Sequence, residues 1–261
     1  MTPTIRGATQ QIIKALEQLP WTAWDQVVQE EPEFQVMRPL AEVYPPGAFL
    51  VLMVVAGLND YQLKGKAEIM YWPLLRQHLE LELVPSSLEG LGILLEPFYH
   101  EERMGIQKVH RMWRFLRSRI ANQLWVISPA EAGRQIRVLW REIAAVMAQP
   151  PEAKTIAFSI KTLAIGLLLL GEENFEFAGI ALPVDSRLLK LTPALNGEGV
   201  REFWGTVLAK LRQSEPRLTH LHLDSLLWQY SGASNAEAFL RQLGVANPAE
   251  TVEAFNVLLK L

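Results

Sequence analysis

The amino-acid sequence predicts an all-α protein, and three observations lead to that prediction. Apolar residues recur along most of the chain at the 3.6-residue spacing of amphipathic helices. No stretch shows the alternation and turn signals of a strong β-hairpin. Proline, glycine and Ser-x-x-Glu signals mark where helices begin and end. The breaks between helices are short, so we expect one compact domain with two lobes over residues 1–261.

The composition agrees with a buried core and excludes several kinds of chemistry. Of the 261 residues, 49% are hydrophobic and none is cysteine. The lack of cysteine excludes disulfides, thiol catalysis, cysteine-ligated zinc and iron–sulfur clusters. The longest apolar runs, 48–58 and 163–170, are shorter than the roughly 20 residues that span a bilayer. We therefore expect a cytoplasmic protein without membrane contact. Its net charge of −3 confines any nucleic-acid binding to a local patch.

In the N-terminal half, clear breaks separate the helical stretches. A single proline divides the first two helices, and the motif Pro-Pro-Gly precedes an apolar third helix. A polar turn leads to a fourth stretch, in which Pro73 is expected to break or kink the helix. The expected helices are 10–19, 21–31, 48–58 and 67–82.

Residues 103–120 form the most informative helical stretch of the first half. Apolar residues fall on one side of the helix, basic residues fall on the rest of its circumference, and no residue in the stretch is acidic. Such a helix is either a solvated surface whose charges pair with glutamates elsewhere or a phosphate-binding surface. The apolar residues are Ile106, Val109, Trp113, Leu116 and Ile120; the basic ones are Arg103, Lys108, Arg111, Arg114 and Arg117.

Residues 130–170 have the outline of a helix–hairpin–helix motif. A serine cap, a proline and a glutamate, from residue 128 on, are typical of a helix start, and that helix is expected to end near Met147. The short connector 149–153 leads directly into a second helix, 154–170.

Three later helices each have a recognisable start. Asp185 is placed to cap the helix 186–191. A Ser-x-x-Glu pattern opens the helix 234–243, and Asn247 precedes the helix 248–259.

The start of the helix 154–170 carries side chains that could do chemistry. Lys154, Phe158 and Lys161 share the face opposite the apolar stripe of this helix. Two neighbouring amines raise each other's cost of protonation, and partial desolvation has the same effect. A neutral lysine can attack a sugar carbon and form a Schiff base. Most lysines at helix starts are simply exposed, so these residues alone leave both interpretations open.

Asp185 and the pair Asp224 and Trp228 are the other chemical candidates. A carboxylate at a helix start usually caps the helix, but it could also stabilise positive charge on a sugar ring. Asp224 and Trp228 lie one helical turn apart, which suits a flat, hydrogen-bonding ligand such as a base. The alternative is a core tryptophan beside a capping aspartate. His220 and His222 near Asp224 match no strong metal motif.

Together these segments resemble the archaeal 8-oxoguanine DNA glycosylase family (AGOG), a divergent branch of the helix–hairpin–helix glycosylases. Their order and spacing agree over most of the chain. The resemblance implies a two-lobed helix–hairpin–helix glycosylase fold with the active site in the cleft between the lobes. The matching motifs are EAKTIAFSIK at 152–161, LPVDSRL at 182–188, LHLDSLLW at 221–228 and YQLKGK at 61–66.

The resemblance also implies an activity. The protein would be a bifunctional glycosylase and abasic-site lyase that excises 8-oxoguanine and then cuts the strand by β-elimination. Lys154 would be the nucleophile and Schiff-base former, and Asp185 the essential acid. The partner would be damaged DNA with the 8-oxoguanine flipped out. We expect a monomer, associated with the nucleoid of a prokaryotic cell, that needs no metal and no organic cofactor.

Further residues are expected to contact the DNA. The expected neighbours of the extruded base are Phe158, Lys161, Asp224, Trp228 and one aromatic after Gly65, either Tyr71 or Trp72. The expected backbone contacts come from the basic helix and the hairpin, through Lys108, Arg111, Arg114 and Gln149.

One position departs from the family pattern. The family places a glutamine against the base, just after a proline, where this chain has Glu33. An ionised glutamate accepts hydrogen bonds but cannot donate them, so 8-oxoguanine specificity is less secure than glycosylase chemistry. The alternatives are a glycosylase for another damaged base, a lesion-binding module with weak catalysis, and a helical scaffold. A scaffold would show no salt-dependent DNA binding.

Overall fold

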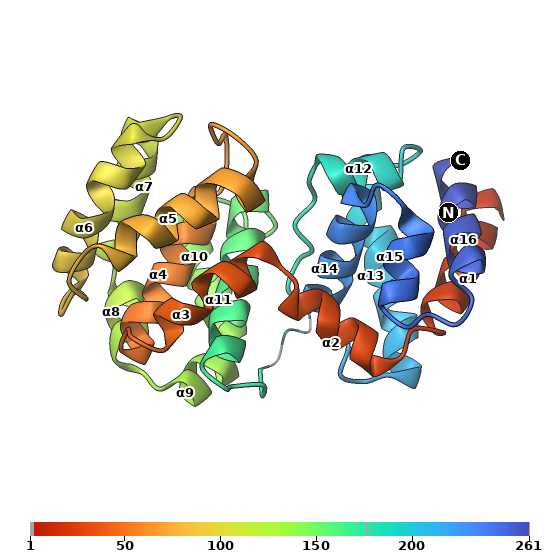
Figure 1. Ribbon diagram of the computed structural model, residues 1–261, viewed down its shortest axis with the longest axis horizontal. Helices are drawn as coiled ribbons and strands as arrows, with labels where there is room; N and C mark the ends of the chain where they lie inside the picture. Colours follow the sequence, from red (N-terminus) through yellow and green to blue (C-terminus); the bar gives the residue numbers. More distant parts are fainter. Residues whose placement is uncertain (1–2, 176, 178, 261) are drawn as a thin grey trace. The chain divides into compact units, whose positions relative to one another are not determined.

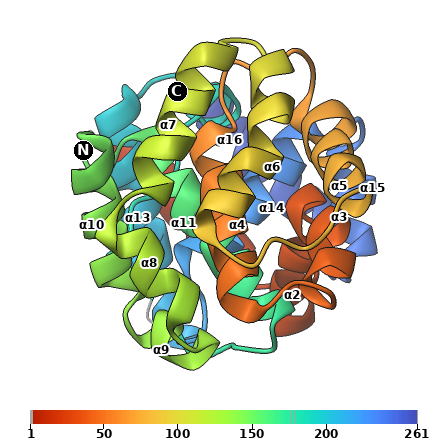
Figure 2. The ribbon, with the colours of Figure 1, turned by 90° about the vertical axis from the view of Figure 1, so that its left-hand side faces the viewer.

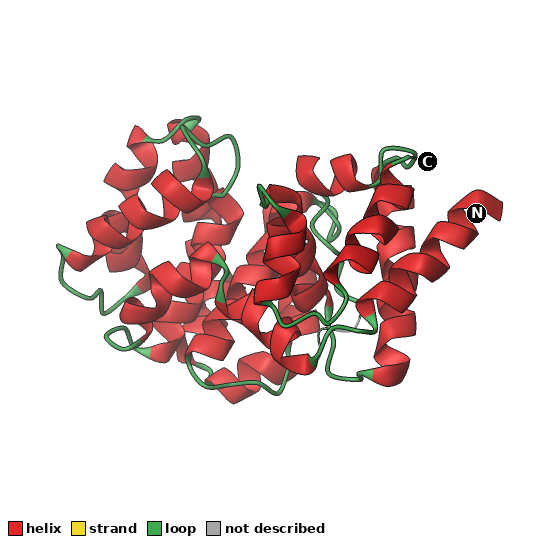
Figure 3. Ribbon diagram, turned by 45° about the vertical axis from the view of Figure 1, so that its right-hand side comes forward, coloured by secondary structure: helices red, strands yellow, loops and turns green. Residues whose placement is uncertain are grey.

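Every regular element in the described part of the chain is a helix. The computed structural model describes residues 3–175, 177 and 179–260 (Figure 1). Helices alternate with loops throughout these residues, and no strand lies among them (Figure 3). The all-α fold class predicted from the sequence is therefore confirmed. None of the described helices has the length and apolar character needed to cross a bilayer.

Contacts within the chain divide it into two compact units. Unit 1 combines Met1–Glu30 with Ala181–Leu261, and unit 2 is the continuous stretch Glu31–Ile180. Each unit has its own buried apolar core. The expectation that the two units form one two-lobed domain stays a prediction.

The helices of unit 2 surround a buried central helix, α4 (Pro46–Asn59). Its residues from Gly47 to Asn59 are all buried, which explains why its sequence is apolar on every side. Helices α6, α7, α8 and α11 pack around it (Figure 2). The other helices of this unit are α3 (Pro32–Ala41), the π-helix η1 (Ala67–Tyr71), α5 (Trp72–Glu80), α6 (Leu88–Glu101), α7 (Gly105–Leu116), α8 (Arg119–Val126), α9 (Pro129–Arg134), α10 (Ile136–Met147) and α11 (Lys154–Leu169).

Helices α4 and α11 run antiparallel and approach closely at Gly57. The hydroxyl of Thr162 on α11 donates to the carbonyl oxygen of Met53 on α4 at 2.8 Å. One turn later on α4, the Cα of Gly57 faces the backbone of Ser159. A glycine is needed here because the two backbones leave no room for a side chain. This contact brings the C-terminal end of α4 towards the N-terminal end of α11.

We expect Gly57→Ala to destabilise unit 2. A Cβ at residue 57 would lie 2.3 Å from Thr162 Oγ1 and 2.7 Å from Ser159 Cα, so the two helices would have to separate. Overpacking of this kind costs about 1–3 kcal/mol of the free energy of unfolding. Urea unfolding measures the effect. Gly7→Ala on α1 is the control, because a Cβ there meets nothing within 4 Å. Equal midpoints for Gly57→Ala and the wild type would contradict the close packing.

Unit 1 packs N-terminal helices against C-terminal ones. Helix α1 (Pro3–Leu16) lies beside α16 (Pro248–Leu259), and α2 (Trp21–Gln29) lies beside α14 (His220–Gly232) (Figure 1). The remaining helices are α12 (Ser186–Leu191), α13 (Gly197–Ser214) and α15 (Ala236–Gln242). Aromatic contacts among Phe203, Trp204, Tyr230 and Phe255 form part of the core.

Some predicted helix boundaries are confirmed, others differ by several residues, and two predicted helices are each divided in two. The predicted helices 186–191 and 248–259 coincide with α12 and α16. The predicted helix 103–120 is two helices, because the chain leaves the helical path after Leu116 and the Ser118 hydroxyl caps α8. The predicted helix that ends at Met147 is likewise divided, into α9 and α10, at Gln135.

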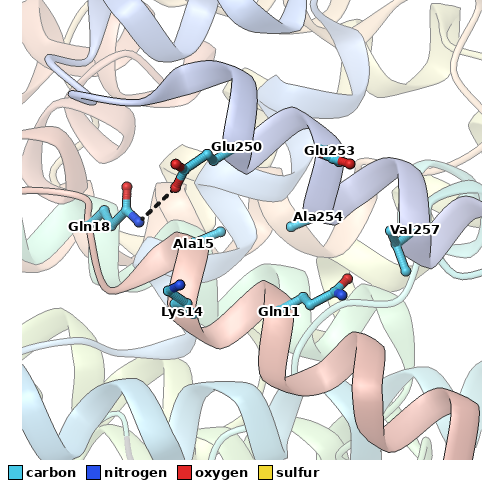
Figure 4. A pocket seen from close by; sticks show the side chains of 8 residues that line it. All are labelled: Gln11, Lys14, Ala15, Gln18, Glu250, Glu253, Ala254 and Val257. Carbon is cyan, nitrogen blue, oxygen red and sulfur yellow. Dashed lines mark hydrogen bonds between the residues drawn. The ribbon is translucent and has the colours of Figure 1, made fainter.

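A surface groove of about 300 Å³ lies between α1 and α16 in unit 1 (Figure 4). Gln18 Nε2 donates to Glu250 Oε2 across it at 3.3 Å. Two glutamates and one lysine line the groove, so it does not favour a phosphate, and none of the predicted site residues reaches it. Its lining residues are Gln11, Lys14, Ala15, Gln18, Glu250, Glu253, Ala254 and Val257.

Candidate active site

The hairpin between α10 and α11 presents Lys154. Helix α10 ends at Met147, as predicted, and Ala148 then adopts a left-handed conformation (φ 50°) that turns the chain. Trp140 Nε1 donates to the Pro151 carbonyl oxygen at 2.8 Å and holds the turn against α10. Lys154 is the first residue of α11, and its side chain is exposed.

Arg111 ties this hairpin to the end of α4. Its Nη2 lies 3.2 Å from the Leu58 carbonyl oxygen, the Thr155 hydroxyl and Gln149 Oε1, and its Nη1 also donates to Gln149. The Thr155 hydroxyl donates to the same Gln149 oxygen at 3.1 Å. The side chains of Arg111 and Gln149 therefore stabilise the hairpin through hydrogen bonds to each other and to Thr155. Their predicted contacts with the DNA backbone remain predictions, as does that of the exposed Arg114.

The prediction that Lys108 contacts the DNA backbone is not supported by its position. The side chain is fully buried, and its amine lies 3.2 Å from Glu102 Oε2. It also lies 5.4 Å from the centre of the Tyr61 ring and 5.7 Å from that of the Tyr71 ring. Ile106, predicted to be on the apolar face, is 68% exposed. The buried face of α7 thus includes a lysine whose charge Glu102 compensates.

Lys161 forms a buried ion pair with Glu31. Its amine lies 2.8 Å from Glu31 Oε1, and both side chains are almost completely enclosed. The same amine lies 5.7 Å from the centre of the Phe158 ring. Phe158 is half-buried on the next turn towards Lys154. The structure thus places Lys161 and Phe158 side by side, and their contact with a base stays a prediction.

Glu33 lies in the first turn of α3, close to this pair. Its side chain is buried, and its Oε2 has no hydrogen-bond partner among the described residues. Burial raises the pKa of Glu33 well above its usual range; the negative charges of Glu31 and Asp60 add to this effect, and Lys161 opposes it. These effects favour the neutral acid. A neutral carboxyl group can donate a hydrogen bond, which the sequence-based argument for an ionised Glu33 did not allow.

Tyr71 and Trp72 are both buried in unit 2. The Tyr71 hydroxyl donates to the Ala56 carbonyl oxygen at 2.8 Å and lies 3.2 Å from the Tyr99 hydroxyl. Trp72 Nε1 donates to Asp60 Oδ2 at 3.1 Å. Both polar groups thus bind protein atoms near the end of α4. The predicted stacking of one of these rings on a base stays a prediction.

Sequence reasoning missed Asp60, the residue that follows α4. Its carboxylate accepts the Trp72 hydrogen bond, and it is partly exposed. Burial raises the pKa of Asp60 to about 6, and the positive charge of Lys154 is the largest effect that opposes this rise. The sequence around Asp60 contains no motif that marks it as a site residue. Its hydrogen-bond partner, Trp72, belongs to a different helix.

In unit 1, Asp185 caps α12 as predicted. Its Oδ1 accepts hydrogen bonds from the backbone N–H groups of Arg187 at 2.9 Å and Leu188 at 3.0 Å. The side chain is partly exposed. Two amide donors hold the carboxylate in one orientation, which suits a catalytic group as well as a cap. Its catalytic role stays a prediction.

Asp224 and Trp228 lie on successive turns of α14. Asp224 is buried and Trp228 is half-buried. The guanidinium carbon of Arg187, from α12, lies 3.8 Å from the centre of the Trp228 ring, close enough for a cation–π contact. The structure thus joins the motif around Asp185 to the motif around Trp228 within unit 1. That these residues hold a base is still a prediction.

Of the two histidines near Asp224, His222 takes part in the cap of α14. The Thr219 backbone N–H donates to His222 Nδ1 at 3.3 Å, which forms a capping box at the start of the helix. Burial lowers the pKa of His220 and that of His222 to about 4, so both are neutral at neutral pH. Among the described residues, no group of three or more histidine, aspartate or glutamate side chains is placed to hold a metal ion.

A family model assigns the chain to a known family. The model of AGOG, described as N-glycosylase/DNA lyase, matches residues 13–256 of the chain. The chain belongs to the AGOG family. It is therefore an enzyme of the DNA glycosylase/lyase class, a class that acts in DNA repair and binds DNA.

Individual AGOG relatives agree with this assignment. The N-glycosylase/DNA lyase of Thermococcus kodakarensis is 25% identical over 205 residues, which cover 77% of this chain and 74% of the relative. That of Methanopyrus kandleri is 22% identical over 197 residues, 75% of this chain and 78% of the relative. A solved 8-oxoguanine DNA glycosylase from Pyrobaculum aerophilum, in complex with 8-oxoguanosine, matches 97% of both chains with a TM-score of 0.75 and 18% identity. That structural match shows the shared fold.

Proposed function

We propose that this AGOG protein is a bifunctional DNA glycosylase and abasic-site lyase that removes 8-oxoguanine through a Schiff base on Lys154. The observation that carries the proposal is the position and exposure of the Lys154 side chain. It is an exposed amine at the first position of α11, on a hairpin that Arg111 ties to the end of α4. The Pyrobaculum relative, solved with 8-oxoguanosine, supports the choice of base.

In the proposed reaction the damaged nucleotide leaves the duplex before chemistry begins. Flipping costs a few kcal/mol, which contacts to the extruded base repay. The neutral amine of Lys154 forms a bond to C1′ while the electrons of the C1′–base bond leave with the base. The carboxylate of Asp185 stabilises the positive charge that develops on the sugar. Lys154 belongs to unit 2 and Asp185 to unit 1, so their meeting at the sugar is part of the proposal.

The second half of the reaction uses the same amine. Loss of a proton from the nitrogen and opening of the sugar ring convert the adduct into a Schiff base. The Schiff base acidifies the C2′ hydrogen, and β-elimination breaks the C3′–oxygen bond. The protein would bind DNA as a monomer and would need no metal or organic cofactor for these steps.

The start of α11 and the exposed face of α7 are the proposed contacts to the DNA backbone. Ala153 precedes α11 and supplies no side-chain cap for the amides of its first turn. The Ile156 N–H donates to the Ala153 carbonyl oxygen at 2.9 Å, so the N–H groups of Lys154 and Thr155 are the ones proposed to bind a phosphate. Arg114 is exposed on α7, the helix whose Arg111 holds the hairpin, and adds positive charge.

We expect excision of 8-oxoguanine to fall as the pH rises through the raised pKa of Glu33. Below that pKa the neutral Glu33 donates a hydrogen bond to the base, and above it the donor is lost. Glu33→Gln keeps a donor at every pH, so its excision rate should lose this alkaline decline. Single-turnover release of the base across a pH series measures both profiles. Superimposable profiles for the two proteins would exclude a proton on Glu33 as the cause.

The proposed function is tested with oligonucleotides that carry different damaged bases. Released base and cut strand are scored separately. Strand cutting is scored both with and without heating of the reaction products in alkali. We expect 8-oxoguanine to be released first and the strand to be cut without alkali. Release of another base instead of 8-oxoguanine would support glycosylase activity and show that the substrate is a different damaged base. Binding of 8-oxoguanine DNA without base release after long incubation would instead indicate a lesion-binding module.

A further inference from the structure

Asp60 lies where the end of α4 meets the start of α11. The guanidinium of Arg111 fixes this meeting point, because its Nη2 binds both the Leu58 carbonyl oxygen and the Thr155 hydroxyl at 3.2 Å. Leu58 is two residues before Asp60, and Thr155 is the residue after Lys154. The backbone therefore brings Asp60 beside the first turn of α11.

The carboxylate of Asp60 has a fixed orientation. Trp72 Nε1 donates to its Oδ2 at 3.1 Å, and the Asp60 backbone N–H closes the last turn of α4 on the Gly57 carbonyl oxygen at 3.4 Å. The residue remains partly exposed. One side of the carboxylate is thus held by protein, while the residue as a whole still reaches solvent.

Lys154 is the accessible cation among those around Asp60. The cations that act on its carboxylate are Lys154, Lys108 and Lys161. Lys108 and Lys161 are buried in ion pairs with Glu102 and Glu31, whereas Lys154 is exposed. The other titratable groups that interact with Asp60 are Glu33 from α3, Tyr71 from η1 and Tyr99 from α6.

We propose that Asp60 is a positioning residue for the nucleophile of the proposed function, on which this inference rests. Its carboxylate attracts the Lys154 ammonium to the end of α4 and accepts one of its protons before attack, directly or through one water molecule. The transfer leaves a neutral amine and a carboxylic acid, and no other bond changes. The lone pair so released is the one that attacks C1′.

The raised basicity of Asp60 suits this role. A lysine with its ordinary pKa of about 10.4 is charged at neutral pH and cannot attack. An aspartate with its ordinary pKa of about 3.9 is a weak base. Since burial raises the pKa of Asp60 to about 6, it is a stronger base that is still ionised at pH 7. Asp60 loses this capacity below about pH 6, where it is already protonated.

Borohydride trapping on 8-oxoguanine DNA across a pH series tests the role of Asp60. The wild-type rate should rise with pH through a midpoint near 6. Asp60→Asn keeps an oxygen that can accept the Trp72 hydrogen bond and removes the charge. We expect it to react about 10- to 100-fold more slowly at pH 7.5 and to lose the rise near pH 6. Asp60→Glu should restore part of the rate and part of the rise near pH 6. Asp25 is an exposed carboxylate of α2, and Asp25→Asn should change neither the rate nor the rise.

A second variant tests the proposal without removing the carboxylate. The Trp72 hydrogen bond lowers the pKa of Asp60, so Trp72→Phe should move the midpoint of the rise to higher pH. A purely structural role would change the rate and leave the midpoint in place. The proposal is overturned if Asp60→Asn keeps the wild-type rate and rise, or if the Trp72→Phe midpoint does not move. A wild-type protein that forms no adduct at any pH would instead refute the proposed function itself.

Discussion

Replacing Lys154 by glutamine should abolish the covalent adduct that borohydride traps between the wild-type protein and 8-oxoguanine DNA. Glutamine has no amine, so neither the bond to C1′ nor the Schiff base can form. Base release should fall on the order of 10³-fold or more, since removal of a nucleophile removes the reaction path and not merely one contact. Lys154 is exposed at the first position of α11, so the substitution should leave the free energy of unfolding almost unchanged.

DNA binding separates this expectation from a failure to bind. We expect Lys154→Gln to retain most of its affinity for 8-oxoguanine DNA, with a small loss from the missing charge. Lys210→Gln, on the exposed side of α13, makes the same change in net charge and should trap like the wild type. If Lys154→Gln still forms the adduct, another amine is the nucleophile and the proposed mechanism is wrong.

The parts of the fold that could be predicted are those with local signals. The cap Asp185 before α12 and the break between α10 and α11 depend on residues within a few positions of each other. The N–H groups that Asp185 binds belong to residues 187 and 188, so a capping pattern is sufficient to place it. The same holds for Lys154, whose position follows from the start of a helix.

The parts that could not be predicted depend on contacts between distant elements. A helical wheel places Lys108 with the other basic residues of α7, but Glu102 in the preceding loop allows it to be buried. Glu33 was identified by position, yet its protonation depends on Glu31, Asp60 and Lys161, which come from three different parts of unit 2. Chain patterns show which residue types are present, whereas the charge of a buried group depends on its neighbours in space.

Asp60 illustrates the same limit for the candidate site. It follows the most apolar helix of the chain and belongs to no recognised motif. Its hydrogen-bond donor is 12 residues away, and the lysine whose charge acts on it most strongly is on another helix, so no sequence window contains the group. The motif around Lys154 points to a nucleophile, and only the packing of α4 on α11 brings the charge of Lys154 to act on the Asp60 carboxylate.

Replacing Asp185 by asparagine should remove activity while keeping the fold of unit 1. The Oδ1 of asparagine can accept the same N–H groups of Arg187 and Leu188, and asparagine is as good an N-cap as aspartate. The negative charge is lost, so the positive charge on the sugar is no longer stabilised. We expect both base release and adduct formation to fall by about 10²- to 10⁴-fold in single-turnover assays.

Asp185→Ala distinguishes the charge of this residue from its capping role. Alanine removes the cap as well as the charge, so α12 should lose about 1 kcal/mol of stability. Asp185→Asn should unfold at the wild-type midpoint, yet the two variants should be equally inactive, because both lack the carboxylate. If Asp185→Asn were active and only Asp185→Ala impaired, capping would explain the whole effect of Asp185. Another group would then have to stabilise the positive charge on the sugar.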